Sequence, residues 1–125
     1  YYADFEDLTS AGLDALIISG ANVTNPALDL EPFWEPLQEV VTWAAGNVTS
    51  ILCSCLATHA LVKHLQGISD AEITELNIPT GVPLRYQLSD DMAPADDLSV
   101  DQRYIMDPDE VARRGKAVAE QAAGG

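Results

Sequence analysis

The stretch LDALIISG, residues 13–20, decides the fold class of this chain. Its nearly unbroken apolar run stops at Gly20, a pattern typical of a strand buried on both faces, and such strands belong to parallel sheets. A second short apolar run at residues 50–54 has the same character. Between the two, apolar residues recur every three or four positions over 33–44, which predicts an amphipathic helix. The order strand, helix, strand predicts a right-handed parallel crossover.

Further elements are predicted beyond the second strand. Residues 57–66 have the pattern of a second helix that stops at a glycine, and Ser69 with Glu72 forms a capping box for a short helix. Residues 83–88 alternate like a half-exposed strand, and residues 103–106 are predicted to pair with them as an antiparallel hairpin. A final Ala-rich helix follows the N-cap and proline of Asp107-Pro108. These elements are added to the parallel unit.

We therefore expect a three-layer α/β fold with a parallel, flavodoxin-like β-α-β-α core and a C-terminal antiparallel hairpin and helix. The length of 125 residues predicts a single domain over residues 1–125. No apolar run reaches the roughly 18 residues that span a bilayer. The first residues lack the features of a secretory signal, so we expect a cytoplasmic protein.

The charge distribution excludes several classes of partner. The formal net charge is −14, and all six Lys and Arg residues lie at position 63 or later. Nucleic-acid binding requires a basic surface, and anionic membranes repel a chain of this charge. We therefore predict neither nucleic acid nor membrane as a partner.

Two cysteines lie close together, at positions 53 and 55. In a strand their side chains share a face but lie too far apart along it to form a disulfide easily. A Cys-x-Cys pair without a second cysteine cluster is also a poor zinc signature, even with His59 and His64 nearby. We predict no disulfide, no metal site and no cofactor.

Four motifs in order resemble the homoserine O-acyltransferases of methionine biosynthesis: DALIISGAN (14–22), EPFW (31–34), NVTS (47–50) and SCLATHA (54–60). The resemblance, to the homoserine O-succinyltransferase family, implies a fold like that of the class I glutamine amidotransferases. It also implies that a cysteine at a strand-to-helix elbow takes an acyl group from acyl-CoA and passes it to homoserine. Cys55 stands at that position, and the backbone N–H groups of Leu56 and Ala21 would form the oxyanion hole.

A second resemblance covers residues 60–121, on the motifs ALVKHLQGISD (60–70) and LNIPTGVPL (76–84) and the ending at 107–121. These are similar to the C-terminus of the 2,3-bisphosphoglycerate-dependent phosphoglycerate mutases. In that family a His-Gly-Asn strand precedes this helix, whereas here Cys55-Leu56-Ala57 stands in its place. The catalytic histidines and phosphate-binding arginines of the mutases have no identified counterpart.

Together the two resemblances suggest a chimera. Residues 1–60 would be an acyltransferase-like segment and residues 61–125 a mutase-like one, joined within a helix over 57–67. A designed or recombined protein and a natural mosaic are both open. We expect the helix to run unbroken through the join, because its apolar residues keep helical spacing.

Cys55 is the candidate nucleophile. Between a buried strand and a helix start, a thiolate is stabilised by the helix N-terminus. The alternative is a small buried apolar residue, since free cysteine is among the most buried residue types. Acyl transfer also needs a base and a group that orients it. His59 is interpreted as structural and His64 is expected to face solvent or the sheet edge, so we expect no complete catalytic set.

Three functions therefore stay open at this point: a residual Cys-dependent homoserine O-acyltransferase, a mutase-like remnant that interconverts 2- and 3-phosphoglycerate, and a chimeric α/β protein without complete catalytic machinery. The expected ligands are acyl-CoA or homoserine, bound weakly. Exposed sheet edges also suggest a homo-oligomer. Three acids, Asp14, Glu31 and Glu35, are interpreted as a strand start and a helix cap rather than paired catalytic carboxylates.

Overall fold

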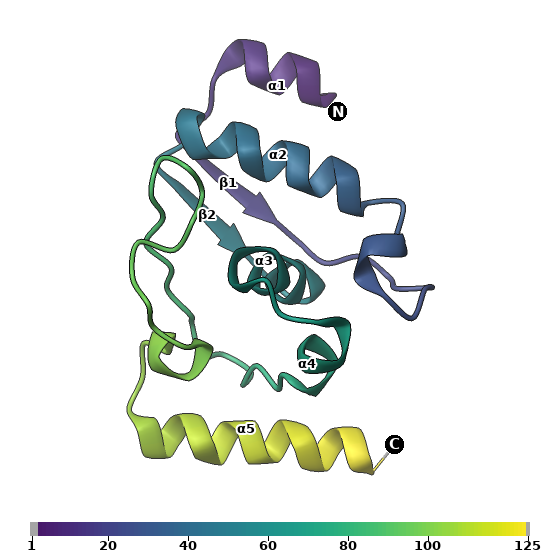
Figure 1. Cartoon of the computed structure of the whole chain (residues 1–125), viewed down its shortest axis with the longest axis vertical. Helices are drawn as coiled ribbons and strands as arrows, with labels where there is room; N and C mark the ends of the chain where they lie inside the picture. Colours follow the sequence, from purple (N-terminus) through teal and green to yellow (C-terminus); the bar gives the residue numbers. More distant parts are fainter. Residues whose placement is uncertain (1–2, 125) are drawn as a thin grey trace.

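The computed structural model describes residues 3–124 and places a small parallel sheet among helices (Figure 1). Its elements in chain order are α1 (Phe5–Ala11), β1 (Ala15–Ile18), η1 (Leu28–Leu30), α2 (Trp34–Asn47), β2 (Ser50–Cys53), α3 (Leu56–Gln66), α4 (Asp70–Glu75), η2 (Val100–Arg103) and α5 (Pro108–Ala123), where η marks a 3-10 helix. The mixed α/β class is confirmed.

The sheet is smaller than the sequence predicts. β1 and β2 pair in parallel, with Ala15 opposite Ser50 and Ile18 opposite Cys53. The predicted strand, helix, strand order is therefore correct, with α2 as the connection. Among residues 3–124, however, the sheet has two strands, so a flavodoxin-like core is not formed by this part of the chain.

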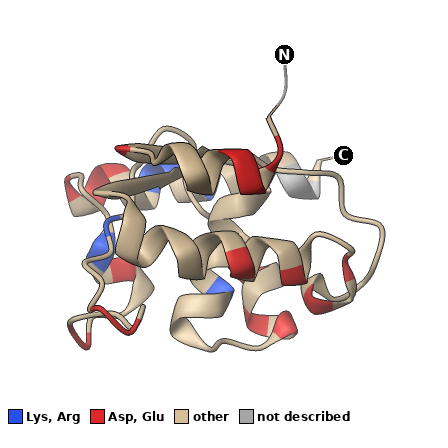
Figure 2. Cartoon of the chain, turned by 90° about the horizontal axis from the view of Figure 1, so that it is seen from above, with Lys and Arg blue, Asp and Glu red and all other residues tan. Residues whose placement is uncertain are grey.

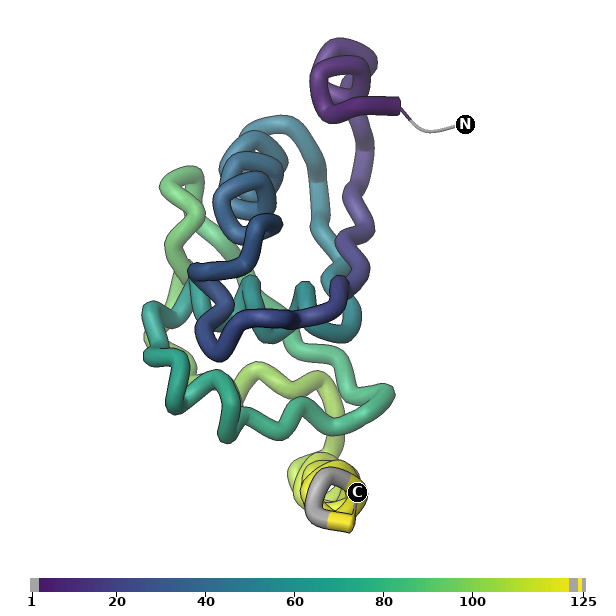
Figure 3. The backbone as a smooth tube through the Cα atoms, turned by 90° about the vertical axis from the view of Figure 1, so that its right-hand side faces the viewer, coloured from purple at the N-terminus to yellow at the C-terminus, as the bar shows by residue number. Residues whose placement is uncertain are grey.

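One face of this sheet is bare. Ile17 and Leu52 lie opposite each other in the strand register, and their exposed fractions are 72% and 62%. Figure 3 shows α2 on one side of the two strands and no described segment on the other. Parallel strands normally have both faces covered. The apolar strand residues predicted to be buried on both faces are therefore half-buried on one face and exposed on the other.

The hydrophobic core lies around α3 rather than around the sheet. Its buried cluster joins Leu28, Ala60, Val62 and Ile73, and aromatic and aliphatic side chains from α2 and the C-terminal part pack against it. Small residues on α3 allow neighbouring elements to approach its backbone closely. The helix that begins at the candidate nucleophile is therefore anchored by the core.

Helix α3 runs without interruption through residues 57–66, as predicted. It ends at Gly67, which adopts a left-handed conformation (φ 62°) and donates its N–H to the carbonyl of Lys63. Glycine tolerates this conformation without steric cost, which makes it a common helix terminator. The predicted capping box of Ser69 and Glu72 then begins α4.

The predicted antiparallel hairpin is reduced to one isolated bridge, between Leu84 and Tyr104. The amide of Ile105 also donates to the carbonyl of Pro83, at 2.9 Å. The prediction of a strand over 103–106 is therefore wrong in extent. The physical reason is a capping box between Ser99 and Gln102, which starts the 3-10 helix η2 and ends the extended pairing.

The two terminal helices lie at opposite ends of the molecule (Figure 1). Sequence patterning did not predict α1, which begins at the N-cap Asp4. The last helix, α5, begins at Asp107 as predicted, and Arg114 donates from it to the carbonyl of Thr80 at 3.3 Å. Among the side chains of α5 that the structure describes, none is buried.

Acidic residues are spread over many of the elements, and basic residues are few (Figure 2). A screen of residues 3–124 found no helix with the length and apolar character needed to cross a membrane.

Candidate active site

Cys55 occupies a sharp turn between β2 and α3. It is the N-cap of α3, with φ 56° and ψ −135°, and its side chain is exposed. A positive φ is rare for a residue with a β-carbon and costs about 1–3 kcal/mol, so it persists where the surroundings impose it. The alternative of a buried apolar cysteine is wrong for this residue, because Cys55 is exposed.

The loop after β1 presses against this turn. A β-carbon built on Gly20 would lie 2.8 Å from the backbone nitrogen of Leu56 and 3.1 Å from Sγ of Cys55. Real β-carbons essentially never approach a backbone atom within 3.0 Å, so any larger residue at this position would force the turn to shift. The close approach brings the segment that carries Ala21 beside the first residue of α3, the two places predicted for the oxyanion hole.

Glu31 forms hydrogen bonds to the same loop. It is 5% exposed, and its carboxylate accepts hydrogen bonds from the amides of Asn25, at 2.6 Å, and Thr24. The Asn25 amide lowers the pKa of Glu31 most, followed by that of Thr24, against the opposing effect of burial. The interpretation of Glu31 as a helix cap is therefore wrong: α2 begins at Trp34, and Glu31 instead orders the loop that follows β1.

Cys55 lines a groove of about 1160 Å³, whose walls are β2, α3 and the extended segment 78–92. Cys53, His59 and Arg85 line the same groove. The two thiols differ, because Cys53 is half-buried and burial raises its pKa to about 11. Both cysteines are free, as predicted.

The histidines are held by other groups. His59 Nε2 lies 3.2 Å from the carbonyl oxygen of Leu76, so its protonated nitrogen donates to the end of α4. His64 is exposed, and its Nδ1 lies 3.4 Å from the side-chain nitrogen of Gln38. Neither forms a hydrogen bond to Cys55 in the described part of the chain. His59 thus contacts the backbone of another element, and His64 faces solvent, one of the two positions predicted for it.

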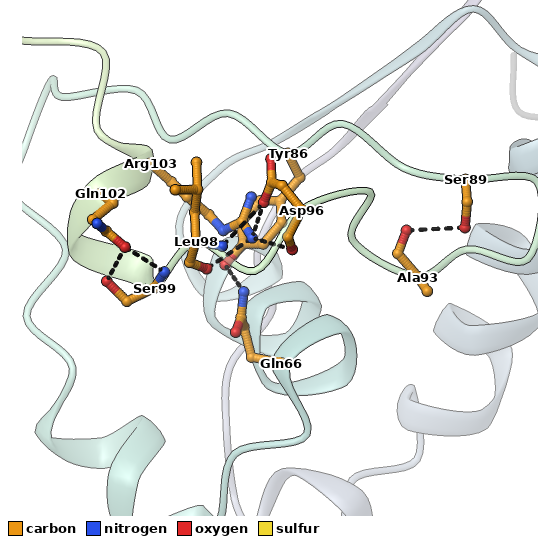
Figure 4. Close-up of polar contacts among 9 residues, drawn as sticks. All are labelled: Gln66, Tyr86, Ser89, Ala93, Asp96, Leu98, Ser99, Gln102 and Arg103. Carbon is orange, nitrogen blue, oxygen red and sulfur yellow. Dashed lines mark hydrogen bonds and ion pairs between the residues drawn. The ribbon is translucent and has the colours of Figure 1, made fainter.

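The opposite wall of the groove is fixed by a buried arginine (Figure 4). The guanidinium of Arg103 is 1% exposed, pairs with Asp96 at 2.6 Å and donates to the carbonyl of Leu98 at 2.8 Å. It also stacks on the ring of Tyr86, whose centroid lies 4.2 Å away, and the Tyr86 hydroxyl accepts from Gln66 of α3 at 3.3 Å. The loop over 86–103 is thereby tied to the core.

A second cavity lies beside the turn and is not lined by Cys55. It has a volume of about 240 Å³ and is lined almost entirely by apolar side chains. Ala21 and Leu56 belong to its wall, whereas Cys55 does not. Of these two spaces, only the groove is lined by Cys55. Across residues 3–124, no three His, Cys, Asp or Glu side chains are placed to share a metal ion.

Sequence reasoning missed three residues that shape this site: Gly20, Glu31 and Arg103. Gly20 was read only as the end of a strand, although a glycine directly after a buried strand is also typical of close backbone approach. Glu31 had a usable signal, since an acid after an Asn- and Pro-rich loop can accept that loop's amides. Arg103 had no such signal, because its contacts with Asp96, Leu98 and Tyr86 depend on how the loop between them folds.

The comparisons with known proteins place the N-terminal part of the chain in one enzyme family. The model of the homoserine O-succinyltransferase family matches residues 1–78. The homoserine O-succinyltransferase of Thiothrix nivea is 68% identical over 68 residues, which are 54% of this chain and 19% of that protein. That of Methylobacter tundripaludum is 65% identical with the same coverage, and that of Cardiobacterium hominis is 46% identical over 55% of this chain and 20% of the relative.

These comparisons also limit the predicted chimera. The family match continues past residue 60, where the mutase-like segment was expected to begin, and reaches residue 78. No comparison supports a phosphoglycerate mutase component or a junction within residues 57–67. The chain spans about one fifth of the length of the curated relatives it matches. Over most of its own length it matches one family model, and the chain belongs to the homoserine O-succinyltransferase family.

Proposed function

We propose that this chain performs the acyl-accepting step of homoserine O-succinyl transfer, with Cys55 as the nucleophile. One observation carries the proposal: the only described cysteine with an exposed thiol sits at a strained turn, at the start of a helix and in the wall of a groove. A nucleophile on such a turn presents its side chain to solvent while the backbone behind it stays packed. The names of the relatives supply the substrate class.

The proposed step is a thioester exchange. The Cys55 thiolate attacks the carbonyl carbon of a succinyl thioester, a new carbon–sulfur bond forms, and the oxygen becomes an oxyanion. Collapse of that intermediate breaks the original carbon–sulfur bond, and the departing thiolate takes a proton from solvent. The amides of Leu56 and Ala21 are proposed to donate to the oxyanion, because the Gly20 contact brings their segments together.

Transfer of the acyl group from Cys55 to homoserine is a separate step with its own requirement. The homoserine hydroxyl must lose a proton as it attacks the acyl-cysteine, and a positioned base typically contributes about 10²–10⁴ in rate. Neither histidine is placed as this base: His59 Nε2 is hydrogen-bonded to the carbonyl of Leu76, and His64 Nδ1 lies beside the side-chain amide of Gln38. We therefore propose that the acyl-cysteine accumulates and that homoserine discharges it slowly.

The test is acylation of the whole chain by succinyl-CoA, followed by intact-mass measurement and peptide mapping. The expected result is one succinyl group per chain, located on Cys55 and released by hydroxylamine, as a thioester is. Cys55→Ala should abolish the adduct, and the matched variant Cys53→Ala should keep it. An adduct that persists in Cys55→Ala, or no adduct on the unmodified chain, would contradict the proposal.

A further inference from the structure

Arg85 is the one cation in the described chain that has no acidic partner. The other five Lys and Arg residues each form an ion pair with Asp or Glu: Lys63 with Asp70, Arg103 with Asp96, Arg113 and Arg114 with Glu110, and Lys116 with Glu120. Arg85 is exposed and lines the same groove as Cys55. In a chain of net charge −14, a guanidinium without a carboxylate is available to an anionic ligand.

The position of Arg85 in the groove wall is fixed on both sides. Its amide donates to the carbonyl of Arg103 at 3.0 Å, and the preceding Leu84 is bridged to Tyr104. The following residue, Tyr86, lies under the buried guanidinium of Arg103 (Figure 4). The backbone that carries Arg85 is therefore ordered before any ligand binds. Such preorganisation reduces the entropic cost of binding.

The other charged groups in the groove do not repeat this role. Asp90 also lines the groove but carries a negative charge, and one ring nitrogen of His59 is hydrogen-bonded to the carbonyl of Leu76. The negative net charge of the chain therefore repels an anionic ligand. The exposed guanidinium of Arg85, in the groove that Cys55 also lines, attracts it. A guanidinium suits a carboxylate, because its parallel N–H groups can donate to both oxygens.

We propose that Arg85 makes the groove selective for acyl groups that carry a carboxylate, by binding that carboxylate while Cys55 attacks the thioester. The inference rests on the proposed function and assigns recognition of the acyl group's carboxylate to Arg85. Arg85 exchanges no proton and forms no bond in the step. It favours a dicarboxylic monothioester, such as a succinyl thioester, over an acetyl thioester of the same thiol.

The direct test uses two alkylating agents of similar size and different charge. Iodoacetate is an anion and iodoacetamide is neutral, and in both reactions the Cys55 thiolate displaces iodide. The measured quantity is the ratio of the two rate constants at Cys55. In Arg85→Gln this ratio should fall by about twofold or more, because the variant removes the cation that attracts the anionic reagent into the groove. An unchanged ratio would overturn the proposal.

Three controls distinguish a local charge from a general effect. Arg85→Lys should restore most of the ratio, because it restores the charge. Arg113→Gln removes a cation outside the groove and should leave the ratio unchanged. High salt should reduce the difference between the unmodified chain and Arg85→Gln, because about 1 M salt shortens the screening length to about 3 Å. An equal fall in Arg113→Gln would overturn the proposal.

A second arm uses succinyl-CoA and acetyl-CoA as acyl donors. The ratio of succinyl to acetyl transfer onto Cys55 should fall in Arg85→Gln, in parallel with the alkylation ratio. If neither donor acylates Cys55, the proposed acyl transfer fails, and the alkylation ratio still decides whether Arg85 acts on anions in the groove. If both donors react and their ratio is the same in the two chains, the selectivity proposal fails alone.

Discussion

The segment from β1 to α3 and the segment from residue 82 to residue 124 are stabilised in different ways. The first contains β1, α2, β2 and α3, with buried residues on α2 and α3. The second contains isolated backbone bridges, a 3-10 helix and α5, and its buried anchors are Val82 and Arg103. Apolar burial dominates in the first segment, and a polar network dominates in the second.

The two kinds of stabilisation give the groove two different walls. The Cys55 wall is set by backbone packing between Gly20 and Leu56, which changes little with pH or salt. The Arg85 wall depends on the ion pair of Arg103 with Asp96, and a buried charge is costly when it loses its partner. We therefore expect the second wall to be the more vulnerable to a single substitution.

Removal of the Arg103 partner should have the largest effect. Asp96→Ala leaves a guanidinium that is 1% exposed without its carboxylate, and we expect a loss of about 3 kcal/mol in the free energy of unfolding. Two of its nitrogens, Nε and Nη1, already lack a hydrogen-bond partner in the described structure. Urea unfolding measures the loss. The neighbouring Asp97→Ala is the matched control, and an equal effect of the two would contradict the account.

A methyl group added at Gly20 should have the second-largest effect. Gly20→Ala places a β-carbon 2.8 Å from the nitrogen of Leu56, so the turn must shift, at a cost of about 1–3 kcal/mol. Alkylation of Cys55 should slow in the same variant. Gly46→Ala is the control, since a β-carbon there meets no atom within 4 Å and alanine favours the helix. If Gly20→Ala behaves like Gly46→Ala, the packed turn is wrong.

Helix α5 should open more readily than α3. None of its described side chains is buried, whereas α3 buries three residues, Ala57, Ala60 and Val62. Local opening free energy follows burial and contact density. Hydrogen–deuterium exchange should therefore show faster amide exchange along α5 than along α3 at the same pH. Equal protection of the two helices would mean that α5 is anchored as firmly as the core.

The smallest expected effect depends on pH. The pKa of Glu31 is lowered from 4.5, chiefly by the Asn25 amide, so its stabilising effect is complete above that value. It is lost as the pH falls through the lowered pKa of the folded state. Glu31→Gln should therefore destabilise the chain at neutral pH and flatten its stability profile below pH 4.5. An unchanged profile in that variant would contradict the carboxylate contacts.

The regular elements of the first segment could be predicted from the sequence because their signals are local. The apolar run before Gly20, the helical spacing around Val41 and the glycine stop at Gly67 each reflect interactions within a few residues. The parallel pairing of β1 with β2 follows from the same pattern. Local signals did not show that Ile17 and Leu52 would be exposed, because that depends on what covers the sheet.

In the candidate site, the position of Cys55 was predictable and its surroundings were not. Cys55 could be named from its motif, and its place before α3 is as expected. The exposure of Cys55 depends on how distant segments pack around it. Arg85 looked like one residue of an alternating strand, and its value as an unpaired cation emerges only when every other cation is seen to have a partner. Contacts between residues far apart in the sequence decide both features.

The stoichiometry of thiol release tests the central claim most directly. The unmodified chain is mixed with excess succinyl-CoA and homoserine, and free CoA is measured against time. We predict a burst of about one equivalent per chain, as expected when a covalent intermediate forms and its discharge limits the rate. A slow phase should follow, and the burst should be absent in Cys55→Ala. Linear release of many equivalents without a burst, or release that survives Cys55→Ala, would contradict the account.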